Sequence, residues 1–107
     1  MRALVTGGTG RVGSAIAARL ENEGWDVFAA GKVHGDISDV EAARAIVQTA
    51  VEELGGLDLL LHAASDGFMP KPVAEVTEED WDAAFGATAK GGFFVTQAAA
   101  QHLRESR

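Results

Sequence analysis

The 107-residue chain contains neither cysteine nor tyrosine, and it has two prolines and few aromatic residues. Without cysteine there is no disulfide framework and no cysteine metal site. His34 and His102 are too far apart and too unaccompanied to predict a metal site of another kind. No apolar run approaches the roughly 20 residues of a membrane span, and the start of the chain does not read as a signal peptide. We therefore expect a soluble, cytoplasmic protein without a membrane partner.

Basic residues are also scarce, because 9 Lys and Arg stand against 16 Asp and Glu and the formal net charge is -7. A nucleic-acid partner would select a Lys/Arg-rich face, so we expect none. A phosphorylated ligand remains compatible with this charge, because backbone N–H groups can bind phosphate. An apolar content near half argues for a folded core. The length suits one small domain over residues 1–107.

Strands and helices alternate along the chain. The uninterrupted apolar run at 3–5 predicts a buried parallel strand, and the largely apolar segments 25–30 and 57–61 predict two more. Apolar residues at helical spacing predict helices over 11–23, from a Ser38–Glu41 capping box to Leu54, and from Thr77 to about Leu103. In the last helix we expect a kink at Gly91-Gly92, and we expect Trp81 and Phe85 to belong to the core.

This alternation predicts an α/β fold: a Rossmann-type, three-layer parallel sheet of about three strands with helices on both faces. About seven residues separate the strand ending near Ala30 from the helix beginning at Ser38. A further parallel strand with its own crossover does not fit there. We expect a loop, or a short irregular extended segment, at Val33-His34.

The motif Gly7-x-x-Gly10-x-x-Gly13 follows a predicted strand and opens a predicted helix. The first glycine permits a tight turn, the second lets the backbone approach a pyrophosphate, and the third lets the helix pack closely on the strand. The N–H groups at the helix start, around Arg11 and Val12, would face the phosphates. The motif predicts a dinucleotide site, and the alternative is a glycine turn without a ligand.

Four segments carry a family resemblance: the glycine motif, Asp36–Asp39, Leu57–Ser65 and the helix over Val76–Gln101. With them the chain resembles the N-terminal, cofactor-binding half of the short-chain dehydrogenase/reductase family. His62-Ala63 and Ser65 depart from the family's Asn-Asn-Ala-Gly motif. Ser65 followed by Phe68-Met69-Pro70 is similar to the pteridine-reductase branch.

The resemblance implies an NAD(P)-dependent oxidoreductase that acts on a carbonyl or alcohol through a Tyr-x-x-x-Lys pair. The chain has no tyrosine, so we assign no catalytic residue and expect little or no activity from it alone. Two alternatives remain: a non-catalytic NADP(H)-binding regulatory module of the atypical branch, and an enzyme of another class, such as a nucleotide-sugar epimerase.

The second strand ends in Ala29-Ala30-Gly31-Lys32, without the acid that grips the ribose 2′-OH in NAD-binding units. Arg11 and Lys32 could flank a 2′-phosphate. We therefore favour NADP(H) as the cofactor, with NAD(H) possible. The alternative for Arg11 and Lys32 is that both are ordinary solvated charges.

The candidate cofactor-binding residues combine the glycine motif, the segment after the second strand and the end of the third strand. They are Gly7, Thr9, Gly10, Arg11, Val12, Gly13, Lys32, Asp36, Ile37, Ala63, Ala64 and Ser65.

Three further roles are open from the sequence. Asp36 either accepts a hydrogen bond from the adenine amino group or is a loop residue. His62 is either an acid/base or a strand-end histidine that bonds the backbone, which we favour. Ser65 could line a substrate pocket. In the resembled fold, a second half would cover one sheet edge and one face of the last helix. With these apolar surfaces uncovered, we expect self-association through the last helix.

Overall fold

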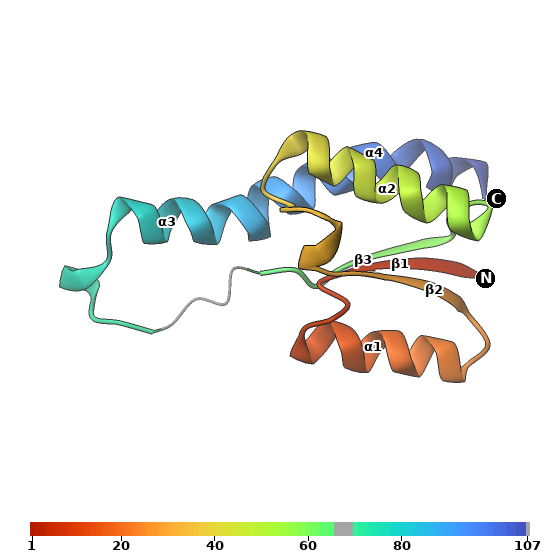
Figure 1. Ribbon diagram of the computed structural model, residues 1–107, viewed down its shortest axis with the longest axis horizontal. Coiled ribbons are helices and arrows are strands. Elements are labelled where there is room, and N and C mark those ends of the chain that lie inside the picture. The colour runs from red at the N-terminus through yellow and green to blue at the C-terminus, as the bar shows by residue number, and fades with distance from the viewer. Residues whose placement is uncertain (66–69, 107) are drawn as a thin grey trace.

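The computed structural model describes residues 1–65 and 70–106. Three parallel strands, β1 (Arg2–Thr6), β2 (Asp26–Ala30) and β3 (Leu59–His62), form one sheet in the order β2-β1-β3. Helix α1 (Arg11–Asn22) covers one face, and α2 (Val40–Leu54) and α4 (Gly91–Glu105) cover the other (Figure 1). The predicted fold of about three parallel strands with helices on both faces is confirmed.

The hydrophobic core lies between the sheet and the pair α2 and α4. The central strand β1 contributes Leu4, and its Ala3, Leu4 and Val5 are fully buried. Around Leu4 the core gathers Phe28, Ala30, Ala43, Ile46, Val47, Ala50, Leu57, Val95 and Ala99. Each buried Val, Leu or Phe side chain contributes about 1.5–3 kcal/mol relative to exposure. Burial on both faces explains why β1 reads as an uninterrupted apolar run.

A single 3₁₀ turn, η1 (Lys32–His34), connects β2 to α2, and no strand lies within residues 31–39. The exclusion of a further strand is therefore confirmed, although the segment is helical and not extended. The predicted Ser38–Glu41 capping box is wrong. The Ser38 hydroxyl donates to Asp36 Oδ1 at 2.7 Å, and Asp39 takes over as N-cap by accepting from the Glu41 N–H.

The last helical region consists of three parts: α3 (Glu78–Phe85), a π-helical segment η3 (Gly86–Lys90) and α4. The predicted cap at Thr77 is present, because its Oγ1 accepts the Asp80 N–H at 3.1 Å. The predicted kink at Gly91-Gly92 is wrong, since the irregular turn lies just before Gly91. No helix among the described residues combines the length and apolar character needed to cross a membrane.

Helix α3 projects beyond the carboxyl ends of the strands, away from the layered body (Figure 1). Trp81 and Phe85 stack on each other with ring centroids 4.5 Å apart, and they are 59% and 48% exposed. The prediction that both belong to the core is wrong, because the sheet does not extend beneath this helix.

Candidate functional site

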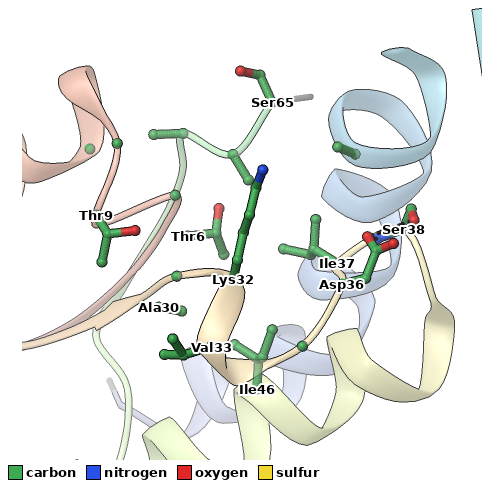
Figure 2. A pocket seen from close by; sticks show the side chains of 18 of the residues that line it. Thr6, Thr9, Ala30, Lys32, Val33, Asp36, Ile37, Ser38, Ile46 and Ser65 are labelled. Atoms are coloured by element: carbon green, nitrogen blue, oxygen red, sulfur yellow. Dashed lines mark hydrogen bonds between the residues drawn. The ribbon is translucent and has the colours of Figure 1, made fainter. Parts of the chain in front are cut away.

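A cleft of about 970 Å³ opens at the carboxyl ends of the three strands (Figure 2). This is the edge where open parallel sheets bind ligands, and the volume lies in the range of small-molecule sites, about 300–1,000 Å³. All twelve residues predicted to bind a cofactor line it: Gly7, Thr9, Gly10, Arg11, Val12, Gly13, Lys32, Asp36, Ile37, Ala63, Ala64 and Ser65. The fold therefore brings together three segments that are distant in sequence.

The glycine loop is shaped by close backbone contacts. Gly7 has φ +64, and the Gly10 N–H donates to its carbonyl at 3.0 Å, closing the turn. A Cβ at Gly13 would lie 1.9 Å from the Gly7 oxygen, so only glycine fits where the helix meets the loop. A Cβ at Gly10 would meet nothing nearer than the Gly7 oxygen at 3.3 Å, so this backbone faces open space. The predicted roles of the three glycines agree with this geometry.

Helix α1 begins at the floor of the cleft without a side-chain cap. Its first backbone hydrogen bond of the α-helical kind runs from the Ser14 N–H to the Gly10 oxygen at 2.9 Å. The N–H groups of Arg11, Val12 and Gly13 precede that bond, and N–H groups in such positions have no partner within a helix. Together with the helix dipole they form an anion cradle.

Two cations line the cleft from different segments. Arg11 begins α1, and Lys32 begins η1 and extends its side chain into the cleft (Figure 2). Both are exposed. Gly31, the residue directly after β2, also lines the cleft and carries no carboxylate.

Asp36 lies at the far side of the cleft, in the loop that leads to α2. Its Oδ1 accepts from the Ser38 N–H at 2.9 Å and from the Ser38 hydroxyl at 2.7 Å. These two hydrogen bonds, and more weakly the charge of Lys32, hold the pKa of Asp36 below its usual value. The carboxylate is thus charged, fixed in orientation and on the wall of the cleft.

His62 ends β3 and bonds through both ring nitrogens. Its Nδ1 lies 2.7 Å from Oγ1 of the fully buried Thr6, and its Nε2 lies 3.2 Å from the Thr88 carbonyl oxygen. A carbonyl only accepts, so Nε2 carries the proton, and in the neutral ring Nδ1 accepts from Thr6. The predicted bond to the backbone is confirmed, and both ring nitrogens have partners within the chain.

The end of β3 forms the third wall of the cleft. The Ala63 N–H donates to the Thr6 oxygen at 3.1 Å, extending the sheet pairing past His62. A Cβ at Gly7 would lie 2.7 Å from the Ala63 oxygen, so this wall packs directly on the glycine loop. Ser65 is exposed. Phe68 and Met69, part of the likeness to pteridine reductases, lie outside the described residues.

The sequence did not reveal the wall formed by the last helical region. Ala83 of α3 and Ala87 of η3 line the cleft opposite the glycine loop. Alanine carries no functional group, so no motif signals this role. The other lining residues not predicted are Thr6, Ala30, Gly31, Val33, Gly35, Ser38 and Ile46.

The parallel sheet, the glycine loop and the cleft at the strand ends define a Rossmann-type protein. A family model described as "Enoyl-(Acyl carrier protein) reductase" matches residues 26–107. The chain belongs to the short-chain dehydrogenase/reductase family.

Known proteins agree with this assignment. The chain is 28% identical to a probable 2,4-dienoyl-CoA reductase of Bacillus subtilis, over 92% of this chain and 47% of that protein. It is 30% identical to 4-formylbenzenesulfonate dehydrogenase of Comamonas testosteroni, over 96% and 49%. The chain thus spans about half the length of these curated relatives.

Solved structures show the same relation. The TT0495 protein from Thermus thermophilus is 32% identical, with a TM-score of 0.85 over 98% of this chain and 51% of that one. A short-chain dehydrogenase from Burkholderia cenocepacia, solved in complex with NADP, is 32% identical, with a TM-score of 0.87 over 95% and 50%.

Proposed function

We propose that this chain binds a dinucleotide cofactor in the cleft and prefers NADP(H) to NAD(H). The observation that carries the proposal is the anion cradle at the start of α1, which shares one cleft with Arg11 and Lys32. The NADP complex of the Burkholderia cenocepacia relative supports it.

The residues present fit such a ligand. The pyrophosphate would lie on the N–H groups after Gly10, where the backbone faces open space and a Cβ at Gly13 finds no room. The adenosine would extend toward η1 and Asp36, with Lys32 and Arg11 near a 2′-phosphate. The nicotinamide end would lie near Ala63, Ala64 and Ser65 at the end of β3.

We propose further that the whole protein is an oxidoreductase acting on a carbonyl or alcohol. When bound, the cofactor supplies hydride transfer. This chain's own residues bind and orient the cofactor, whereas a proton-donating tyrosine is absent from the sequence. We therefore expect the 107 residues alone to bind cofactor and to turn over carbonyl substrates little or not at all.

A second candidate is a regulatory module that binds NADP(H) without catalysis, because the cleft and its anion cradle require only that the cofactor binds. The two candidates differ in one observable. A Tyr-x-x-x-Lys pair encoded downstream in the same reading frame would support the oxidoreductase, and a frame without one would support the module.

The cofactor preference is tested by titrating NADPH and NADH separately into the protein and following nicotinamide fluorescence. We expect NADPH to bind more tightly, and Lys32→Ala to weaken NADPH by about tenfold while changing NADH by less than about twofold. The matched control is Lys90→Ala, an exposed lysine that does not line the cleft. Equal affinities of the unmodified chain for the two cofactors would contradict the preference.

A further inference from the structure

The residue directly after β2, Gly31, lies against the glycine loop. A Cβ built at Gly31 would lie 2.5 Å from Thr9 Oγ1 and 2.8 Å from Thr9 Cγ2. The side chain of Thr9 therefore fills the space that any side chain at position 31 would enter. Units that bind NAD place an acid at the end of this strand to hold the ribose 2′-OH. An acid at position 31 would have to displace the Thr9 side chain.

The turn that follows Gly31 is braced by His34. The Gly31 N–H donates to His34 Nδ1 at 3.0 Å, and the His34 N–H donates back to the Gly31 oxygen at 3.0 Å. The His34 ring also meets Phe28 edge to face, with centroids 5.1 Å apart. Because Phe28 belongs to the core, these contacts connect the exposed turn to the sheet.

Lys32 is the first residue of this braced turn. Its carbonyl accepts the Gly35 N–H at 3.1 Å, and its side chain extends into the cleft (Figure 2). Its backbone is therefore held on both sides, by Gly31 before it and by Gly35 after it. A cation on a fixed backbone loses less freedom when it binds an anion than one on a mobile loop.

We propose that Thr9 and His34 are positioning residues that make the cleft read a 2′-phosphate. Thr9 occupies the space that a carboxylate side chain at position 31 would need, and His34 fixes the turn that presents Lys32. This inference rests on the proposed dinucleotide site and adds the two side chains that set its selectivity.

The test of His34 compares two ligands that differ by one phosphate, adenosine 2′,5′-bisphosphate and 5′-AMP, by calorimetry on the full chain. We expect His34→Ala to weaken the bisphosphate by about tenfold and 5′-AMP by less than about twofold. His34→Asn restores the ratio, because its amide oxygen can accept the Gly31 N–H. His102→Ala, on α4, is the matched control.

These outcomes separate selectivity from stability. If His34 only supported the fold, His34→Ala would weaken both ligands equally, and this result would overturn its role. An unchanged ratio in a folded His34→Ala variant would overturn it too. If the unmodified chain bound neither ligand, the proposed dinucleotide site itself would fail.

The test of Thr9 uses a pair of substitutions. Gly31→Asp alone brings the new side chain into Thr9, so we expect both ligands to bind more weakly. Gly31→Asp combined with Thr9→Gly removes the collision, and 5′-AMP then binds more tightly than the bisphosphate. Thr9→Gly alone controls for the change in the loop. If Gly31→Asp bound 5′-AMP as tightly without the second substitution, the proposed exclusion by Thr9 would be wrong.

Discussion

At the scale of single residues, Arg2 and Asp58 form a multiple side-chain pairing between β1 and the residue before β3. Arg2 Nε lies 3.0 Å from Asp58 Oδ2, and the Arg2 N–H donates to the same oxygen at 2.8 Å. A further guanidinium nitrogen donates to the Gly55 oxygen at 2.8 Å. The pair fixes the start of β1 to the turn that enters β3.

This pair predicts an acid-dependent stability. The hydrogen bonds from Arg2 lower the pKa of Asp58 in the folded chain. The contribution of the Asp58 carboxylate to folding stability is therefore fully present above its pKa in the unfolded chain, about 3.9. This contribution is lost as the pH falls through the lower pKa of the folded chain. We expect Asp58→Asn to lower the thermal midpoint near pH 7 and to differ less from the parent near pH 3. Glu21→Gln, an exposed carboxylate on α1, is the control. An equal deficit at both pH values would contradict the assignment.

At the residue scale, what the sequence revealed depended on local rules. Gly7 is needed for a tight turn, and Gly13 is needed where the helix approaches the loop closely. Both requirements are set by a few neighbouring residues, so the motif predicts them. The Ser38 cap was predicted wrongly because Asp36, two residues earlier, competes for the same hydroxyl. The glycine roles and the helix cap are both short-range effects. The cap, however, depends on which of two possible partners the Ser38 hydroxyl binds.

At the scale of elements, η3 is the irregular part of an otherwise continuous helical region. A Cβ at Gly91 would lie 3.0 Å from Ile37 Cγ2, and one at Gly86 would lie 3.0 Å from Ser38 Cβ. Gly86, the first residue of η3, and Gly91, the residue after it, therefore pack on the loop before α2. π-Helical turns often occur at functional sites, and this one contributes Ala87 to the cleft.

His62 holds η3 to the sheet, so its removal should loosen this turn. We expect His62→Ala to lower the free energy of unfolding by about 1–3 kcal/mol, because the hydroxyl of buried Thr6 then loses its partner. Urea denaturation measures the loss, and hydrogen exchange should be faster in η3. His102→Ala is the control, and an equal loss in both variants would argue against a special role for His62.

The elements themselves were largely predictable, because helical spacing and apolar runs are properties of short windows. The position of the irregular turn was not, because it is set by contacts with Ile37 and Ser38, about 50 residues away in sequence. The wall of Ala83 and Ala87 was missed because alanine carries no functional group and only tertiary packing brings these residues to the cleft. Tertiary packing, and not local preference, decides both.

At the scale of the whole molecule, the layered body and the projecting α3 are distinct in character. The molecule is 48 Å long and 27 Å across, and α3 extends along the long axis (Figure 1). The last helical region exposes Trp81, Phe85 and Phe93, the last of them 62% exposed. We propose a second copy of the chain as the partner for this apolar surface.

This proposal predicts association that depends on concentration. We expect sedimentation velocity to show a shift from monomer to dimer as concentration rises. The double substitution Trp81→Glu with Phe85→Glu should keep the chain monomeric, because it would bury charge in the interface. Ala45→Glu, on the exposed side of α2, should associate like the parent. A parent chain that stays monomeric at high concentration would contradict the proposal.

The strand order β2-β1-β3 has a consequence for how the chain folds. The first strand is central, so it pairs with both of the others. Arg2 pairs with Asp26, 24 residues later in the sequence, and Ala3 pairs with Leu59, 56 residues later. The entropy of closing a loop grows only with the logarithm of its length, so the longer closure costs about 0.8 kcal/mol more than the shorter one. One buried leucine outweighs that difference. The late arrival of β3 in the sequence is therefore a minor obstacle to completing the sheet.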